Sequence, residues 1–427
     1  MEKTNTEFEE NYDFEEILIS YVTSFKIKKK LIKNRKKYLE KNSPRLELPN
    51  KEFEDIPVKP PIYVDQNLKE KLESSILLKT FLYHLFNSIQ GIFFENAFIE
   101  ITYIDNAKIN RFSSVDISKG KDSKIQGDLL LEGSLINVIL YTVDVITIFL
   151  IFENESKEIY DIRTFAHLQH PRHLYIQYQK ENKEETNQIS NNLIELTLME
   201  LTFKLVYDRL GENKEEMERY LKDNYRGRTY TSFYGKVCNN KLDSIHKFIP
   251  MIVEGYTNFY IKDPEKYVEK YDQSQTNDTE IFLTDKTFVV YGICKADSHK
   301  MRSDSKDFIS FGSLIGLLVT YINLYQHEHF EVISRIKYKN ISNREIFQRL
   351  DYILSSASIL YDPNFIETPF LKRLVRYLFK EYNYYEFYES LTATMNNLFF
   401  SRTQKLLIYL TIAVILTGTL SILIILR

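Results

Sequence analysis

The longest apolar stretch of the chain lies between Leu406 and Leu426, where 21 consecutive residues carry no charge and most are Leu, Ile or Val. A helix of this length is about 31 Å long at 1.5 Å per residue, which matches the hydrocarbon core of a bilayer. A helix that is apolar on every side has no polar face to leave in water. The pattern therefore predicts one transmembrane helix over residues 406–426.

The charges around this stretch predict its orientation. Arg402 and Lys405 precede it and only Arg427 follows it, and basic residues are enriched on the cytoplasmic side of a span. The N-terminus is acidic through Glu16 and has neither the basic start nor the apolar core of a secretory signal. We therefore expect a single-pass, tail-anchored membrane protein whose N-terminal body lies in the cytoplasm.

Small residues follow one face of the expected span. Ala413, Thr417 and Ser421 recur every four residues, and Gly418 lies at the edge of the same face. Small side chains let membrane helices approach each other closely. The spacing favours a homo-oligomer formed through the transmembrane helix, although small residues also occur in spans that do not associate.

Upstream of the span, helical and alternating patterns follow one another and predict an α+β body over residues 62–300. Helices are expected at Leu68–Phe94 and Asn191–Tyr220, and strands at Ile99–Tyr103, Phe248–Tyr260 and Thr287–Lys295. The run Leu135–Phe152 is strongly apolar, but ten of its eighteen residues are Ile, Val or Thr and Asp144 lies near its middle. These features favour two strands joined by a turn over a second span.

Residues 1–61 have the composition of a charged N-terminal extension. Nine Lys and Arg residues lie between Lys26 and Lys41, and five prolines from Pro44 to Pro61 indicate a linker. Leu18, Tyr21, Val22, Phe25 and Ile32 roughly follow helical spacing. We interpret the basic stretch as an amphipathic helix that could lie on an anionic membrane surface, or alternatively as a solvated charged helix.

Residues 308–325 allow two interpretations. The eighteen residues are uncharged and contain Gly312-Ser313-Leu314-Ile315-Gly316, a pattern of closely packed membrane helices. Eighteen residues are the short limit for a span, and four polar side chains dilute the hydrophobicity of the segment. A buried helix is therefore favoured over a second span.

A helical region and stalk are expected over residues 301–400. The pattern breaks at Asp362-Pro363 and at Pro369, and an apolar stripe then begins at Leu371. This stripe continues toward the span. The fold class expected for the whole chain is α+β: a mixed α/β soluble body, a helical stalk and one C-terminal transmembrane helix.

Composition and motifs make some classes of function unexpected but do not identify one. The 427 residues are enough for two or three domains. The net charge of −3 comes from 56 basic and 59 acidic residues, so nucleic acid is not expected as the main partner. Cys238 and Cys294 are too few for a disulfide framework. The sequence has no Walker-type phosphate loop, dinucleotide fingerprint, nucleophile elbow or kinase signature, and no cofactor is predicted.

Three weak clusters are the candidates for chemistry. His167, His170 and His173 could hold a metal ion, but Pro171 interrupts the spacing and no cysteine completes the site. His327-Glu328-His329 lacks the His-Glu-x-x-His spacing of zinc proteases. Arg226, Arg228 and Lys236 lie among aromatic residues and could bind an anion. Each cluster is also explained as exposed polar residues.

An α/β body followed by a helical stalk and a C-terminal span resembles the layout of CorA-type magnesium channels over the last hundred residues. Those channels carry Gly-Met-Asn between two terminal spans, and this chain has one expected span and no such tripeptide. The leading hypothesis is a membrane-tethered binding or scaffold protein that recruits a protein partner to the bilayer. The alternatives are an oligomeric, channel-like effector with a second span at 308–325, and a tethered enzyme with an unrecognised site.

Overall fold

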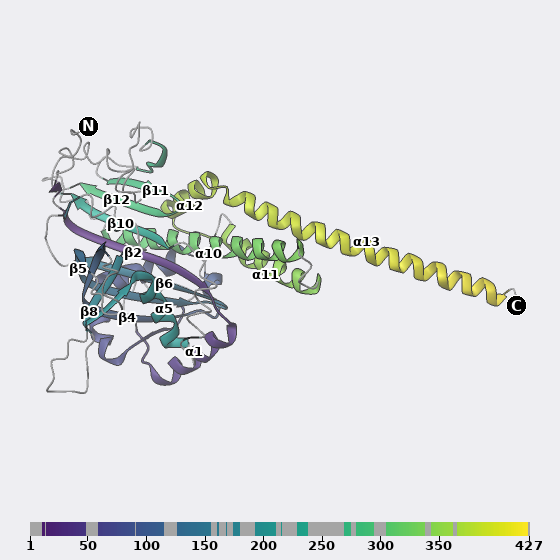
Figure 1. Cartoon of the computed structure of the whole chain (residues 1–427), viewed down its shortest axis with the longest axis horizontal. Helices are drawn as coiled ribbons and strands as arrows, with labels where there is room; N and C mark the ends of the chain where they lie inside the picture. Colours follow the sequence, from purple (N-terminus) through teal and green to yellow (C-terminus); the bar gives the residue numbers. More distant parts are fainter. Residues whose placement is uncertain are drawn as a thin grey trace. The chain divides into compact units, whose positions relative to one another are not determined.

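The structure is a computed structural model, and it divides the chain into two compact units. The sheet unit comprises residues 1–324 and 366–378, and the helical unit comprises residues 325–365 and 379–427. The described residues are 11–12, 14–47, 59–89, 91–114, 126–154, 160–161, 168, 174–179, 193–210, 215, 229–237, 269–274, 279–293, 305–337, 343–361 and 365–425. The fold is a mixed α+β fold, with a large sheet and with helices toward the C-terminus (Figure 1).

The sheet unit is built on a ten-stranded sheet whose strands follow the order β11-β12-β10-β2-β6-β5-β4-β8-β9, with β3 alongside β4. The strands are β2 (Phe14–Lys26), β3 (Ile62–Val64), β4 (Phe98–Ser114), β5 (Gln126–Tyr141), β6 (Val145–Asn154), β8 (Leu174–Gln179), β9 (Leu193–Thr197), β10 (Tyr230–Val237), β11 (Thr279–Leu283) and β12 (Thr287–Ile293). The pairs β10–β12 and β3–β4 are parallel, and the other neighbours are antiparallel. A separate antiparallel pair joins β1 (Asn11–Tyr12) to β7 (Tyr160–Asp161).

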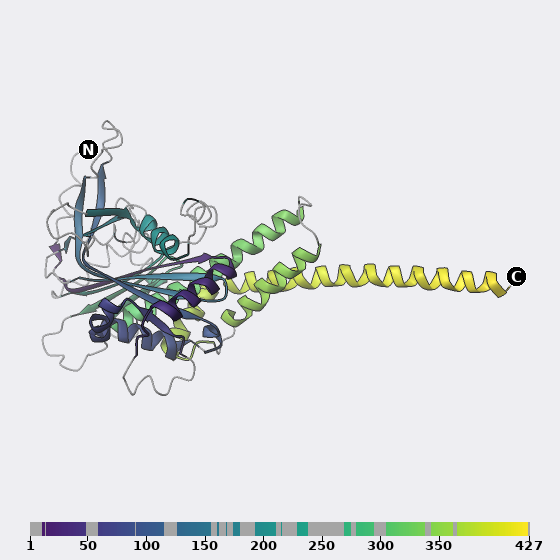
Figure 2. The ribbon, with the colours of Figure 1, turned by 90° about the horizontal axis from the view of Figure 1, so that it is seen from below.

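The long hairpin of β4 and β5 is curved. The pairing register shifts between Ile104 and Ala107, where Asn106 has a φ of 49°. Extra residues in one strand of a pair bend it and increase its twist, and Figure 2 shows the blue β4 and β5 ribbons curving strongly. The same edge of β4 pairs with β3 before the bend and with β8 after it.

One face of the sheet is covered by α10 (Ser305–Lys337). Ser313 Oγ donates a hydrogen bond to Ser20 Oγ at 2.7 Å, and the Thr320 and Ser24 hydroxyls also lie 2.7 Å apart. These pairs give the buried hydroxyls of Ser20 and Ser24 partners where the helix crosses β2. Residues 308–324 are therefore part of a largely buried helix of the sheet unit.

The two glycines of α10 explain how closely this helix approaches the strands. A Cβ atom at Gly316 would lie 2.9 Å from side-chain atoms of Val22 and Tyr230, and one at Gly312 would lie 2.5 Å from Phe288. The Gly-x-x-x-Gly pattern thus serves the packing of a helix on a sheet. A second helix, α3 (Ile76–Ser88), lies on the same face, where Phe81 packs against Phe149 with ring centroids 5.1 Å apart.

The opposite face of the sheet is covered by α1 (Lys29–Asn42) and α5 (Leu198–Leu210). Phe25 of β2 packs against Phe203 of α5, with ring centroids 5.7 Å apart. Ile32 and Leu39 are the buried residues of α1 and belong to the same hydrophobic core. Because β2 is covered on both faces, nearly all its side chains from Ile17 to Phe25 are buried.

In the helical unit, α11 (Asn343–Tyr361) packs against α13 (Tyr384–Ile425). The part of α10 beyond residue 324 belongs to this unit, and its His329 ring lies 5.6 Å from the ring of Phe387. The helix α12 (Pro369–Glu381) precedes α13, and Asn383, with a φ of 56°, stands between them. α13 is one continuous helix of 42 residues, yellow in Figure 1.

Several expectations are confirmed. The run 135–152 forms two strands with Asp144 in the turn between them, and the strands expected at 99–103 and 287–295 are β4 and β12. The region 68–94 is helical, in the form of α2 (Lys69–Ser74), α3 and two short 3₁₀ turns at Gln66–Leu68 and Gly91–Phe94. The helix expected over 191–220 begins later than expected, at Leu198, because Leu193–Thr197 form β9.

The N-terminal extension expected over residues 1–61 requires correction. Residues 14–26 form β2, which lies between β10 and β6 in the sheet. An apolar run that is buried on both sides fits helical spacing as well as strand spacing, so the pattern alone did not separate the two. The body also extends beyond residue 300, because α10 up to Leu324 and residues 366–378 belong to the sheet unit.

Candidate functional site

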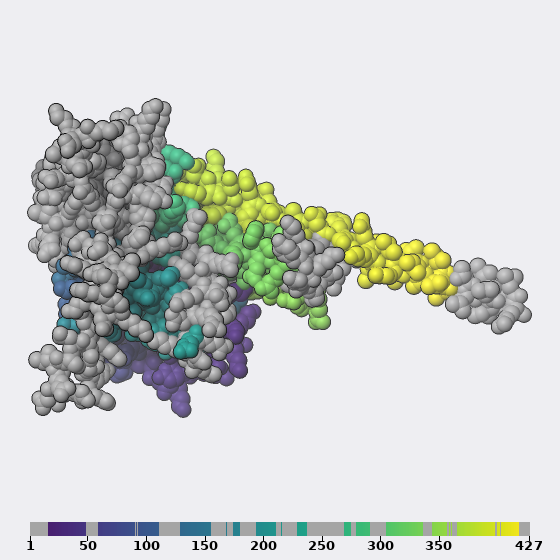
Figure 3. All heavy atoms as spheres, viewed as in Figure 1, coloured from purple at the N-terminus to yellow at the C-terminus, as the bar shows by residue number. Residues whose placement is uncertain are grey.

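The distal half of α13 presents apolar side chains at the surface. Every Leu, Ile, Val and Tyr from Leu406 to Leu416 is about half exposed or more. Figure 3 shows this helix in yellow with its side chains at the surface. α10 and α13 are the two described helices that are long and apolar enough to cross a membrane, but the apolar part of α10 is largely buried and that of α13 is not buried at all.

The two threonines of this segment form hydrogen bonds within the helix itself. Thr411 Oγ1 donates to the Leu407 carbonyl oxygen at 2.8 Å, and Thr417 Oγ1 donates to the Ala413 carbonyl oxygen at 2.8 Å. Such bonds to the preceding turn remove the cost of placing a hydroxyl in an apolar medium. Both threonine hydroxyls within residues 406–417 thus have partners inside the helix, and the apolar side chains around them are exposed.

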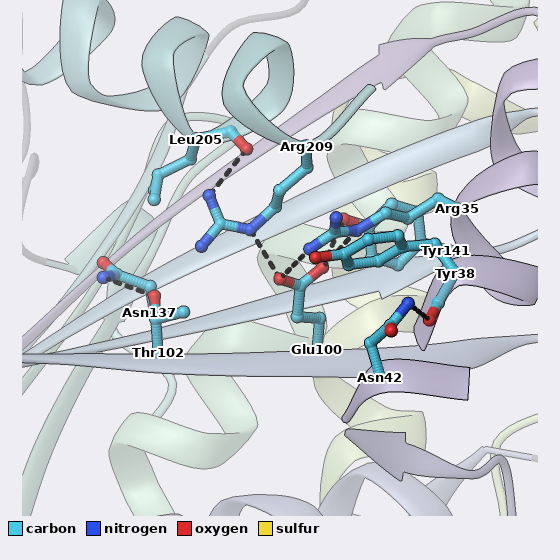
Figure 4. Close-up of polar contacts among 9 residues, drawn as sticks. All are labelled: Arg35, Tyr38, Asn42, Glu100, Thr102, Asn137, Tyr141, Leu205 and Arg209. Atoms are coloured by element: carbon cyan, nitrogen blue, oxygen red, sulfur yellow. Dashed lines mark hydrogen bonds and ion pairs between the residues drawn. The ribbon is translucent and has the colours of Figure 1, made fainter. Parts of the chain in front are cut away.

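A buried polar cluster joins α1 and α5 to the sheet (Figure 4). Glu100 of β4 is only 6% exposed, and its carboxylate accepts two bonds from Arg35 of α1: Nε to Oε2 at 3.1 Å and Nη2 to Oε1 at 2.6 Å. Arg209 of α5 donates from Nε to Oε1 at 2.8 Å, and the Tyr141 hydroxyl of β5 donates to Oε2 at 3.0 Å. The carboxylate therefore receives four hydrogen bonds from three elements.

The charges of this cluster keep Glu100 ionised. Burial by itself raises the pKa of the Glu100 carboxyl, but the charges of Arg209 and Arg35 and the bonds from Arg35 and Tyr141 outweigh it and lower the pKa below its usual value. Burial together with the neighbouring carboxylate raises the pKa of Tyr141 well above its usual value. Since the phenol stays protonated and every group already has a partner, the cluster acts as a clamp between helices and sheet and lacks a free acid or base.

The clamp sets the orientation of α1. Ile32, Arg35 and Leu39 lie three and four residues apart, so they share the face that points to the sheet. The remaining surface of α1 carries six lysines and one acidic residue: Lys29, Lys30, Lys33, Lys36, Lys37, Glu40 and Lys41. Lys28 precedes the helix and is also exposed. The outer face of α1, defined by these residues, is the most basic surface that a single described helix presents.

A hollow of about 570 Å³ lies against the outer face of α1. Its lining consists of Lys29, Lys30, Lys33, Asn34, Lys36, Lys37 and Glu40. The hollow is shallow and largely open to solvent, and its charge suits an anion. In Figure 3 the purple N-terminal part of the described chain, which includes α1, reaches the surface.

Most residues singled out from the sequence for chemistry lie outside the described residues. This holds for His167, His170, His173, Arg226 and Arg228, for both cysteines, for the strand expected at 248–260 and for most of the proline-containing linker. Lys236 lies in β10 opposite Glu16 of β2. Among the described residues, no group of three or more His, Cys, Asp or Glu side chains is arranged to hold a metal ion.

His329 is half-buried in α10, and its Nε2 atom has no hydrogen-bond partner among the described residues. Burial lowers the pKa of this imidazole, so the neutral ring is favoured. The ring packs against Phe387 of α13. His329 thus packs as a neutral ring within the helical unit. It lies beyond the apolar part of α10, among the polar residues that follow it.

The four small residues of the expected span lie in α13. Ala413, Thr417 and Ser421 share one face because they are four residues apart, and Gly418 is adjacent to it. The carbonyl of Ala413 accepts the Thr417 hydroxyl, so Thr417 brings no unsatisfied donor to this face. α13 runs through Ile425 and so includes all but the last residue of the segment 406–426.

The sequence patterns did not reveal the Glu100 cluster. Alternation at 99–103 placed Glu100 on the polar side of a strand, which is the usual solvent side, but α1 and α5 cover that side here. One signal was present: Arg35 is the only arginine in a lysine-rich helix and lies between Ile32 and Leu39 on the buried face. An arginine at such a position suits a buried carboxylate because its planar fork binds both oxygens.

Comparison with known protein families, with curated proteins and with solved structures finds no match for this chain. Two surfaces of the molecule itself are therefore the basis for proposing a function. These are the exposed apolar segment of α13 and the outer face of α1.

Proposed function

We propose that α13 anchors the chain in a membrane and that the sheet unit, facing the cytoplasm, acts as a binding or scaffold module that recruits a protein partner to the bilayer. The observation that carries the proposal is the exposure of the apolar side chains at 406–416. A contiguous apolar surface of this kind marks a site of membrane or protein contact. Its length suits lipid, and so do the bonds of Thr411 and Thr417 to carbonyl groups of the same helix.

The expected orientation supports the cytoplasmic placement. Arg402 and Lys405 lie just before the apolar segment, on the side of the sheet unit in the sequence, and basic residues near a span favour the cytoplasmic side. The cluster of lysines on the outer face of α1 is consistent with the same side, because the cytoplasmic leaflet carries the anionic lipids.

The burial of α10 argues against the channel-like alternative. A second span at 308–325 would have to expose to lipid the same residues that pack against β2 and β10, including Gly312 and Gly316. Leaving the sheet would uncover the buried serines and threonines of β2. The single-span arrangement keeps these contacts.

The anchor is tested with the full chain expressed in cells. We expect it to stay with membranes after alkaline carbonate extraction, and Leu410→Arg combined with Val414→Arg to release it, because a charge at the centre of a span costs about 2.5–3.5 kcal/mol. Thr411→Val, which keeps the segment apolar, is the matched control. Full release of the unaltered chain by carbonate contradicts the proposal.

The number of spans is tested on sealed vesicles whose cytoplasmic face points outward. With one span, added trypsin cleaves both the part of the chain before residue 308 and the segment 326–405. With two spans, the segment 326–405 is protected while the part before residue 308 is cleaved. The second result would transfer the proposal to the channel-like alternative.

A further inference from the structure

We propose that the outer face of α1 binds the phosphate-bearing headgroups of anionic lipids, so that the sheet unit contacts the surface of the membrane through this helix. The inference rests on the proposed function, because it concerns the membrane that α13 enters. It adds a second, electrostatic contact that the anchor does not supply and that depends on lipid composition.

The outer face of α1 has a local excess of positive charge. Six lysines of α1 and the preceding Lys28 stand against one acidic residue, Glu40. Lys33 and Lys37, four residues apart, are both exposed, as are Lys29, Lys30 and Lys41. The chain as a whole is slightly acidic, so this concentration of positive charge is local. Polybasic segments are attracted to anionic leaflets, and the attraction falls off within a Debye length.

The type of cation on the outer face of α1 also suits lipid phosphates. The outer face of α1 carries lysine and no arginine, since Arg35 points to the sheet and binds Glu100. Lysine is a compact point charge on a flexible stem, whereas the arginine fork selects a fixed bidentate geometry. A layer of mobile phosphates at varied positions suits several flexible point charges.

The aromatic content of α1 favours a lipid surface over a nucleic acid as the ligand. Single-stranded nucleic acids are bound by basic grooves in which several aromatic rings stack on bases. On α1 the one aromatic ring is Tyr38, which is 55% exposed, and the Arg35 guanidinium lies 5.0 Å from its ring centroid. One ring that already has a cation on its face is a poor stacking platform.

α1 is held in place by contacts along its inner face. Arg35 binds Glu100, and Ile32 and Leu39 are packed in the core, so α1 is fixed to the sheet along its inner face. The helix that carries the lysines is therefore already in place, and its backbone loses little conformational entropy when the surface binds. The hollow beside Lys33 and Lys37 is open to solvent, so these lysines are accessible to a membrane surface.

The experiment uses the full chain reconstituted through α13 into two kinds of vesicle. One contains phosphatidylcholine only, and the other contains phosphatidylcholine with about a third phosphatidylserine. Lysine acetylation is followed by mass spectrometry, with exposed Lys286, which follows β11, as the internal reference. We expect the lysines of α1 to react at least threefold more slowly in the anionic vesicles at low salt, and high salt to abolish the difference.

Two double variants sharpen the result. Lys33→Gln with Lys37→Gln removes two exposed charges four residues apart on α1, and we expect most of the protection of Lys30 and Lys41 to be lost. Arg376→Gln with Lys380→Gln removes two exposed charges at the same spacing on α12, and we expect the protection to remain. Equal loss in both variants would overturn the assignment to α1.

The outcomes distinguish this inference from the proposed function. Failure of the unaltered chain to float with either vesicle overturns the anchor and the inference together. Flotation with equal α1 reactivity in both vesicles overturns the inference alone. If a short RNA or inorganic phosphate protects the α1 lysines in neutral vesicles as well as the anionic lipid does, the commitment to lipid is wrong.

Discussion

Arg35 and Glu100 form a two-point ion pair, with the guanidinium donating to both carboxylate oxygens at 3.1 and 2.6 Å. The two residues are 65 positions apart and come from α1 and β4, so the pair ties a local helix to the centre of the sheet. Arg209 of α5 shares the same carboxylate. One buried residue thus determines how two helices lie on this face.

Replacing Glu100 with Gln should destabilise the fold by about 3 kcal/mol, because removing one partner of a buried ion pair leaves the remaining charges uncompensated. Here Arg35 and Arg209 would face each other without the carboxylate. The measurement is urea unfolding of the full chain in detergent micelles, followed by circular dichroism. Glu70→Gln on α2 is the matched control, since Glu70 is exposed, and its effect should stay within about 0.5 kcal/mol. Equal effects of the two variants would show that the cluster contributes nothing.

The same cluster predicts a dependence of stability on pH. The pKa of Glu100 is lower in the folded chain than in the unfolded chain, so its contribution is fully present above the unfolded pKa of about 4.3 and is lost as the pH falls through the folded pKa. Unfolding free energy should therefore decrease below about pH 4.3 more steeply for the unaltered chain than for Glu100→Gln. Parallel curves for the two proteins would contradict the assigned shift.

Much of the architecture follows from local pattern, and the clearest failures have a common cause. The hairpin around Asp144 and the breaks before α12 are predicted because β-branched residues and prolines act locally. The assignment of residues 14–26 failed because a strand covered on both faces has no alternation to recognise. Glu100 was missed because its partners, Arg35 and Arg209, lie 65 and 109 positions away. Tertiary pairing decides such positions, and a single sequence does not display it.

Gly312 and Gly316 provide a test of the packing of α10. Gly312→Ala should destabilise the sheet unit by about 1–3 kcal/mol, because the added methyl group would overlap Phe288 and Ser232 and overpacking costs this much. Ser355→Ala, at an exposed position of α11, is the control and should be neutral or slightly stabilising because alanine favours helix. Thermal unfolding in detergent measures both. A neutral Gly312→Ala would mean that α10 does not pack on β10 and β12 as the structure has it, and would favour the second span.

The small face of α13 predicts how copies of the chain associate in the bilayer. Ala413→Leu adds bulk at the first position of the face that also carries Thr417 and Ser421, and close approach of two helices needs small side chains there. We expect it to lower the dimer fraction at least fivefold, measured by energy transfer between labelled chains in vesicles. Val414→Leu adds one carbon at a neighbouring position on another face, and it should leave the dimer fraction unchanged. If Ala413→Leu behaves like Val414→Leu, the helices either do not associate or meet through a different face, and the lipid-exposed surface would have to be reassigned before any scaffold of more than one chain is considered.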